Sequence, residues 1–170
     1  MRENIFYLSL GSNVGDRDAN LRGAIAGLQA IGRIVSISSF YETEPVDFID
    51  QEWFLNCAVA LESSADTEQL MSAILNIEQL MGRQRIQPKG PRLIDIDILI
   101  SSESIIDTPT LTVPHPALHQ RRFVLQPLAE IAPALRHPLL LKTIQELLDA
   151  LPRGQTVRRV QSRPKINDHD

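Results

Sequence analysis

The chain has 170 residues, of which 43% are hydrophobic and 22% charged, a composition typical of one folded globular domain. Its formal net charge of -4 argues against a nucleic-acid-binding protein that relies on a general basic surface. The single cysteine excludes an intrachain disulfide and a zinc site built from several cysteines. Neither a signal peptide nor an apolar run of membrane-spanning length is evident, so we expect a cytoplasmic protein.

Hydrophobic periodicity divides the first hundred residues into strands and helices. Four strands are expected, at Asn4–Leu10, Ile34–Tyr41, Phe54–Leu61 and Leu93–Ile100. One helix begins after Asp16, buries Leu21, Ile25, Leu28 and Ile31, and is ended by Gly32; a second runs over Thr67–Met81 and is ended by Gly82. The order β-α-β-β-α-β predicts an α+β protein with a ferredoxin-like core, in which both helices pack on one face of an antiparallel sheet.

The remaining third of the chain is rich in proline and is expected to be irregular. Thr143 and Glu146 have the spacing of a capping box, which predicts a last helix that runs to Leu151. No linker divides the chain, so a single domain is expected over residues 1–162, followed by a flexible tail at 163–170.

Two acidic residues interrupt the apolar fourth strand. Because side chains alternate along a strand, Asp95 and Asp97 share one face, while Ile94, Ile96, Ile98 and Ile100 form the other and suit packing against the helices. Two carboxylates about 7 Å apart repel each other unless a positive charge lies near them. A hard cation such as Mg²⁺ is one such partner. The alternative is a half-exposed strand with two solvated acids.

Four cations precede this strand within ten residues: Arg83, Arg85, Lys89 and Arg92. Arginine and lysine bind phosphate oxygens, and glycines at Gly82 and Gly90 would allow the segment between them to close over a ligand. Acids for a metal beside bases for phosphate suit Mg-nucleotide chemistry. A solvated loop is the alternative, since a run of charge is more often that.

Three further features could contact a ligand. His115 lies between two prolines and could bind a phosphate or simply hold a turn. Phe54 and Asn56 share a strand face, which suits a flat heterocycle held by stacking and edge hydrogen bonds, or else core packing and a surface turn. The segment Gly11–Gly15 contains no lysine, so it is not a P-loop and is expected to form a tight strand-to-helix turn.

Seven segments, in order and at matching spacing, carry a resemblance to a known family: Leu10–Gly15, Ser39–Thr43, Phe54–Val59, Ile77–Arg85, Gly90–Asp97, Leu111–Pro116 and Arg121–Leu128. The most specific are Gly-Pro-Arg-x-x-Asp-x-Asp at 90–97 and Val-Pro-His at 113–115. In these segments the chain resembles the 6-hydroxymethyl-7,8-dihydropterin pyrophosphokinases of folate biosynthesis. The resemblance implies an enzyme that transfers pyrophosphate from ATP to the hydroxymethyl group of the reduced pterin and releases AMP.

The same resemblance implies roles for individual residues. Asp95 and Asp97 would hold two Mg²⁺ ions. Arg83 and Arg92 would clamp the transferring phosphates. The other expected ATP contacts are Glu78, Arg85, Lys89, Ile98, Thr112, His115 and Arg121. The pterin ring would stack between Phe54 and Phe123. Its edge would form hydrogen bonds with Asn56 and with the backbone of Thr43, Pro45 and Val46.

The chain also departs from the family pattern. The loop from Arg85 to Gly90 is one residue short, and Lys89 stands where many members have tryptophan. Glu44, Leu75 and Thr110 are further departures, which affect loop closure and single ATP contacts rather than the reaction. Two other function classes stay open: a two-metal nucleotidyltransferase or nuclease, and a non-catalytic pterin- or nucleotide-binding module. Neither nucleic acid nor membrane is expected as a partner, and we expect a monomer or at most a weak dimer.

Overall fold

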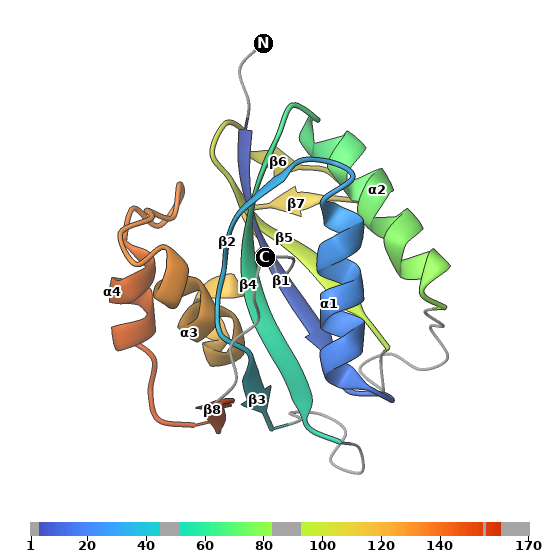
Figure 1. Cartoon of the computed structure of the whole chain (residues 1–170). Coiled ribbons are helices and arrows are strands. Elements are labelled where there is room, and N and C mark those ends of the chain that lie inside the picture. The colour runs from blue at the N-terminus through green and yellow to red at the C-terminus, as the bar shows by residue number, and fades with distance from the viewer. Residues whose placement is uncertain (1–3, 45–51, 83–92, 155, 161–170) are drawn as a thin grey trace.

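The computed structural model describes residues 4–44, 52–82, 93–154 and 156–160 (Figure 1). Its centre is a six-stranded antiparallel sheet in the order β5-β1-β4-β3-β8, with β2 also paired to β4. The strands of this sheet are β1 (Asn4–Ser12), β2 (Arg33–Ile37), β3 (Tyr41–Thr43), β4 (Phe54–Ser63), β5 (Asp95–Ser101) and β8 (Val157–Arg159). A separate hairpin pairs β6 (Ile106–Asp107) with β7 (Thr112–Val113).

Helices cover both faces of the sheet (Figure 1). The helices α1 (Arg17–Leu28) and α2 (Thr67–Leu80) lie on one face, and α3 (Arg122–Ile131) and α4 (Ile144–Asp149) lie on the other. A short 3₁₀ helix, Leu118–Gln120, precedes α3. The predicted α+β fold is confirmed, but the face that carries Asp95 and Asp97, expected to be the open side of the sheet, is partly covered by α3 and α4. Among the residues described, none of the helices has the length and apolar character that a membrane crossing requires.

The cap predicted for the first helix is confirmed, because the Asp16 side chain accepts a hydrogen bond from the backbone N–H of Ala19. Helix α2 begins with a capping box between Asp66 and Gln69, which was not predicted. Gly82 follows α2 with φ +86°, the left-handed conformation that favours glycine at a helix end. The first helix ends at Leu28, so Ile31 lies outside it, although it packs against the core.

Two predicted strand boundaries are wrong. Gly11 and Ser12 are not part of a turn but extend β1, where they pair with Asn56 and Leu55 of β4. The second expected strand is split into β2 and β3 at Ser38, whose backbone N–H donates to the Ala58 carbonyl and whose hydroxyl accepts from the Ala58 N–H. Both changes place more residues opposite the end of β4 that carries Phe54 and Asn56.

The isoleucines of β5 follow the predicted alternation only as far as Ile98. Ile94, Ile96 and Ile98 belong to the core beneath α1 and α2, as predicted. The prediction for Ile100 is wrong, because Ile100 belongs to the core beneath α3 and α4.

A β-bulge is the physical reason for this change of face. Leu8 of β1 pairs with Ile98, whereas the preceding Tyr7 pairs with Ile100, so Leu99 is the extra residue in β5. Leu99 and Ile100 therefore both contribute to the second core. The Leu99 carbonyl also accepts a hydrogen bond of 2.8 Å from the backbone N–H of His115, which anchors the His115 segment beside β5.

The C-terminal third is more regular than its composition suggests. The capping box of Thr143 and Glu146 is confirmed, although α4 ends at Asp149 rather than Leu151. The helix α3 and the strand β8 were not expected. Because β8 pairs with β3, the end of the described chain forms one edge of the sheet. The tail predicted at 163–170 lies outside the described residues.

Candidate active site

The two aspartates stand on one face of β5, as their spacing predicts. Asp95 lies opposite Gly11 of β1 and Asp97 lies opposite Ser9, and both acids are half-buried. Ile96 between them points to the other face and is 2% exposed. A rigid strand with a buried anchor between two acids fixes both carboxylates in relation to the sheet.

A buried glutamate on α2 forms a hydrogen bond with the backbone of this strand. Glu78 is 3% exposed, and its Oε2 accepts a hydrogen bond of 2.8 Å from the backbone N–H of Ile96. Among the described strands β5 lies at an edge of the sheet, so this carboxylate satisfies a backbone donor that none of those strands reaches. The contact of Glu78 with ATP stays a prediction; what the structure shows is that Glu78 holds Ile96, the residue between the two aspartates.

His115 lies close to both Asp95 and Arg121. Burial, followed by the positive charge of Arg121, holds the pKa of His115 below its usual value, and the negative charge of Asp95 opposes them. The Nδ1 atom of His115 accepts a hydrogen bond from the backbone N–H of Ala117 at 3.1 Å. The neutral ring therefore carries its proton on Nε2, which is a donor suited to a phosphate oxygen.

A glycine separates the acids from the predicted pterin residues. The cross-strand row through Gly11 has Asp95 on one side and Asn56 on the other, with Tyr41 beyond Asn56. A Cβ atom added to Gly11 would lie 2.7 Å from Nδ2 of Asn56 and 3.6 Å from the ring of Phe54. Because Gly11 has no side chain, the Asn56 amide and the Phe54 ring can lie close against β1 in the strip of sheet between Asp95 and Asn56, which is about 10 Å wide across two strand spacings.

Two buried polar atoms beside this strip have no hydrogen-bond partner among the described residues: Oγ1 of Thr43 and Oδ1 of Asn56. The two residues are 2% and 4% exposed. Thr43 pairs with Phe54 in the sheet, so it lies on the same face as Asn56. A buried polar atom without a partner costs about 1–3 kcal/mol, a cost that a bound ligand with matching polar groups would remove.

Phe123 approaches this face from the start of α3. It is half-buried in the second core, and the guanidinium carbon of Arg121 lies 5.6 Å from the centre of its ring. Helix α3 packs on β4, the strand that carries Phe54. The placement of a ring between Phe54 and Phe123 stays a prediction.

Other predicted site residues are placed less directly. Ile98 is buried in the first core, so only its backbone at the sheet edge could contact ATP. Thr112 is half-buried in β7. The predicted contacts of six further residues lie outside the described part of the chain: Pro45, Val46, Arg83, Arg85, Lys89 and Arg92.

The acid pair fits a hard cation that takes its other ligands from a substrate. Among the described residues, no group of three or more histidine, cysteine or acidic side chains is placed to hold a metal ion. A pair of carboxylates is nevertheless a sufficient protein contribution for Mg²⁺, which keeps waters and binds substrate phosphates. The residues present therefore suit Mg²⁺ brought in with a nucleotide rather than a closed structural metal site.

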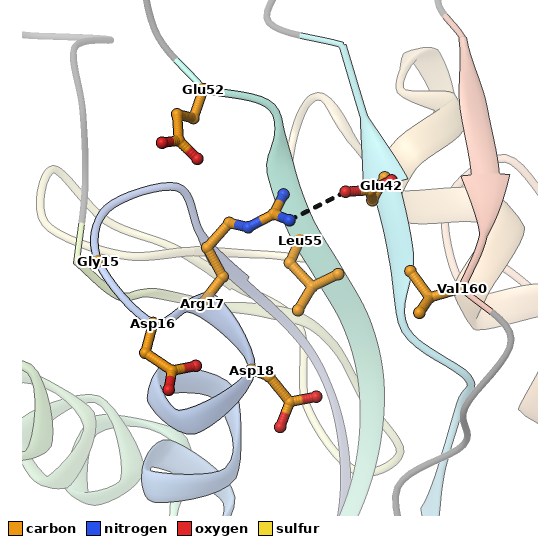
Figure 2. Close-up of a pocket in the computed structure, with 8 residues that line it drawn as sticks. All are labelled: Gly15, Asp16, Arg17, Asp18, Glu42, Glu52, Leu55 and Val160. Carbon is orange, nitrogen blue, oxygen red and sulfur yellow. Dashed lines mark hydrogen bonds and ion pairs between the residues drawn. The ribbon is translucent and has the colours of Figure 1, made fainter.

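A separate pocket lies by the start of α1 (Figure 2). Its volume is about 580 Å³, and it is lined by Gly15, Asp16, Arg17, Asp18, Glu42, Glu52, Leu55 and Val160. Nη2 of Arg17 pairs with Oε2 of Glu42 at 2.9 Å, and this bond is the largest cause of a lowered pKa at Glu42. Leu55 points to the opposite face of β4 from Asn56, so this pocket is distinct from the strip over Gly11.

Three comparisons with known proteins bear on this site. A protein family described as 7,8-dihydro-6-hydroxymethylpterin-pyrophosphokinase matches residues 7–133. The 2-amino-4-hydroxy-6-hydroxymethyldihydropteridine pyrophosphokinase of Bacillus subtilis is 46% identical over 130 residues, which make up 75% of this chain and 78% of that protein. The folic acid synthesis protein fol1 of Schizosaccharomyces pombe is 40% identical over 153 residues, which make up 89% of this chain and 21% of the yeast protein.

Solved structures agree on the fold. A structure of Plasmodium falciparum HPPK-DHPS superposes with a TM-score of 0.69 at 18% identity and covers 87% of this chain. The matched region is 45% of the Plasmodium chain, so this chain spans under half of that protein and about a fifth of the yeast one.

Proposed function

The chain belongs to the 7,8-dihydro-6-hydroxymethylpterin-pyrophosphokinase family, and we propose that it is an ATP-dependent pyrophosphokinase of folate biosynthesis that acts at the face around Gly11. In this reaction the pterin hydroxymethyl oxygen attacks the β-phosphorus of ATP. The bond from that phosphorus to the oxygen shared with the α-phosphate breaks, AMP leaves, and the hydroxyl proton passes to solvent. Catalysis of such a transfer depends on positioning and on neutralising charge.

The row of residues across Gly11 is the observation that carries this placement. Gly11 is bordered by carboxylates on one side and by an amide and an aromatic ring on the other. Mg·ATP requires the carboxylates, and a flat heterocycle requires the amide and the aromatic ring. The two substrates must lie side by side for the phosphorus and the attacking oxygen to meet. A module that only binds the pterin would need the amide and the ring but not the carboxylates.

On the nucleotide side, Asp95 and Asp97 would hold Mg²⁺, with two ions expected from the resemblance. When bound, Mg²⁺ would neutralise charge on the ATP phosphates. His115 would donate from Nε2 to a phosphate oxygen, and the nearby Arg121 would add positive charge. The phosphate clamp by Arg83 and Arg92 is proposed from the resemblance alone.

On the pterin side, the buried oxygen atoms of Thr43 and Asn56 would pair with polar groups on the edge of the ring. The ring itself would lie beside the Asn56 amide, between Phe54 and Phe123. Because a site that leaves buried polar atoms unpaired rejects ligands without matching groups, these two atoms would select the pterin over other flat rings.

The products formed from ATP, Mg²⁺ and 6-hydroxymethyl-7,8-dihydropterin test the proposed reaction. We expect AMP and a pterin diphosphate in equal amounts, separated by ion-exchange chromatography. Release of ADP or of free pyrophosphate would contradict pyrophosphoryl transfer, and pyrophosphate would point to a nucleotidyltransferase. Pterin binding without any AMP would identify a binding module instead.

A further inference from the structure

The carboxylate of Glu130, in the last turn of α3, joins three parts of the chain. Its Oε1 accepts a hydrogen bond of 2.6 Å from the hydroxyl of Tyr41. Both of its oxygens accept from the backbone N–H of Ser39 at 3.1 Å, and Oε2 also accepts from the Ser39 hydroxyl at 3.0 Å. Nη2 of Arg159 in β8 lies 3.6 Å from Oε2, and Nε of the same residue donates to the Ser39 hydroxyl.

This cluster favours the charged form of the acid. Burial alone would raise the pKa of Glu130, but the hydrogen bonds from Tyr41 and Ser39 and the charge of Arg159 outweigh it, so the pKa is lowered. The Glu130 side chain is 18% exposed, and its partners lie 89 and 91 residues away along the chain. The Glu130 carboxylate therefore holds segments that are distant in the chain against each other, rather than stabilising its own helix.

The segments that Glu130 joins carry both walls of the proposed pterin site. Tyr41 pairs with Asn56 across the sheet, and Thr43 follows two residues later on the same face. Phe123 precedes Glu130 by seven residues on α3, which is two helical turns, so both side chains lie on one side of the helix. The position of α3 on the sheet therefore sets the space between Phe123 and the Asn56 face.

We propose that Glu130 is a positioning residue for the pterin: it holds α3 against β3 so that Phe123 and the Asn56 face stay at the separation that the ring requires. This inference rests on the proposed function. It also extends the site beyond the part that matches the family, because Arg159 lies after residue 133, where that match ends.

Glu130→Gln tests the proposal. The backbone N–H of Ser39 donates to both carboxylate oxygens of Glu130. The glutamine side chain has the same shape but one NH₂ group, which would face a hydrogen-bond donor in place of one of these oxygens. We expect the KM for the pterin and its Kd, measured by fluorescence titration, to rise about tenfold, with the KM for ATP changed less than about twofold. Glu62→Gln is the matched control, since Glu62 pairs with Arg33 near the other end of β4 and should alter neither constant.

Tyr41→Phe separates positioning from general destabilisation. It removes one hydroxyl from the same cluster and should also raise the KM for the pterin. Its thermal melt should match that of the unaltered chain, so the test stands even if Glu130→Gln does not fold. Pterin constants unchanged in Tyr41→Phe, or equal rises in the constants for pterin and ATP, would overturn the proposal. If the unaltered chain binds the pterin but releases no AMP, the proposed function fails. The positioning role of Glu130 is then decided by comparing the Kd for the pterin between the unaltered chain and the variants.

Discussion

Asp97→Ala is expected to lower the rate of AMP formation by about a thousandfold, the usual scale for loss of a group that stabilises transition-state charge. The carboxylate of Asp97 is half of the acid pair, and the strand around it is held by the buried Ile96 and Ile98. The fold should therefore persist. Steady-state rates at saturating Mg²⁺ measure the effect, and a circular dichroism melt checks the fold.

Glu103→Ala is the matched control for this change, because Glu103 is an exposed acid that follows β5 at the end far from Asp95, outside the proposed site. It should retain the rate of the unaltered chain. Full activity in Asp97→Ala, or equal losses in both variants, would remove the metal-holding role from the acid pair.

Gly11→Ala is expected to weaken pterin binding by about a hundredfold, which is about 2.8 kcal/mol and within the cost of losing a partner of a buried polar group. The new Cβ would lie 2.7 Å from Nδ2 of Asn56, the end of a side chain that can turn aside. The sheet should therefore survive, while the methyl group displaces the Asn56 amide from the place where it would meet the pterin. Isothermal titration with the pterin measures the loss, and titration with Mg·ATP should show little change.

Gly154→Ala provides the control for Gly11→Ala. A Cβ atom at Gly154 would meet nothing within 4 Å, so the same substitution there should leave both affinities unchanged. Tight pterin binding by Gly11→Ala would show that the ring does not lie over the strip between Asp95 and Asn56.

Local patterns in the sequence predicted much of this site. The period of two placed Asp95 and Asp97 on one face, and the caps at Asp16 and Thr143 placed two helix starts. These features depend on residues a few positions apart, so they can be inferred from sequence alone. The same pattern predicted that Phe54 and Asn56 share one face. It could not predict that they lie beside Gly11, because that depends on the register between β1 and β4.

Features that depend on distant residues were missed. The bulge at Leu99 moves Ile100 to the other face, and nothing in a run of isoleucines signals an extra residue. The partners of Glu130 come from β3 and β8, far away in the chain, and a lone glutamate in an apolar helix has the pattern of a surface residue. Gly11 was interpreted as part of a turn because glycine near the end of a strand usually marks one.

Paramagnetic relaxation by Mn²⁺ tests most directly whether the acid pair and the amide face one site. The pterin would be bound with Mn²⁺ and an ATP analogue that has a methylene group between the α- and β-phosphorus atoms. Because Asp95 and Asn56 lie two strand spacings apart, about 10 Å, the pterin proton resonances should broaden strongly in the unaltered chain and much less in Asp97→Ala. Sharp pterin resonances in the fully bound complex of the unaltered chain would contradict a shared site over Gly11.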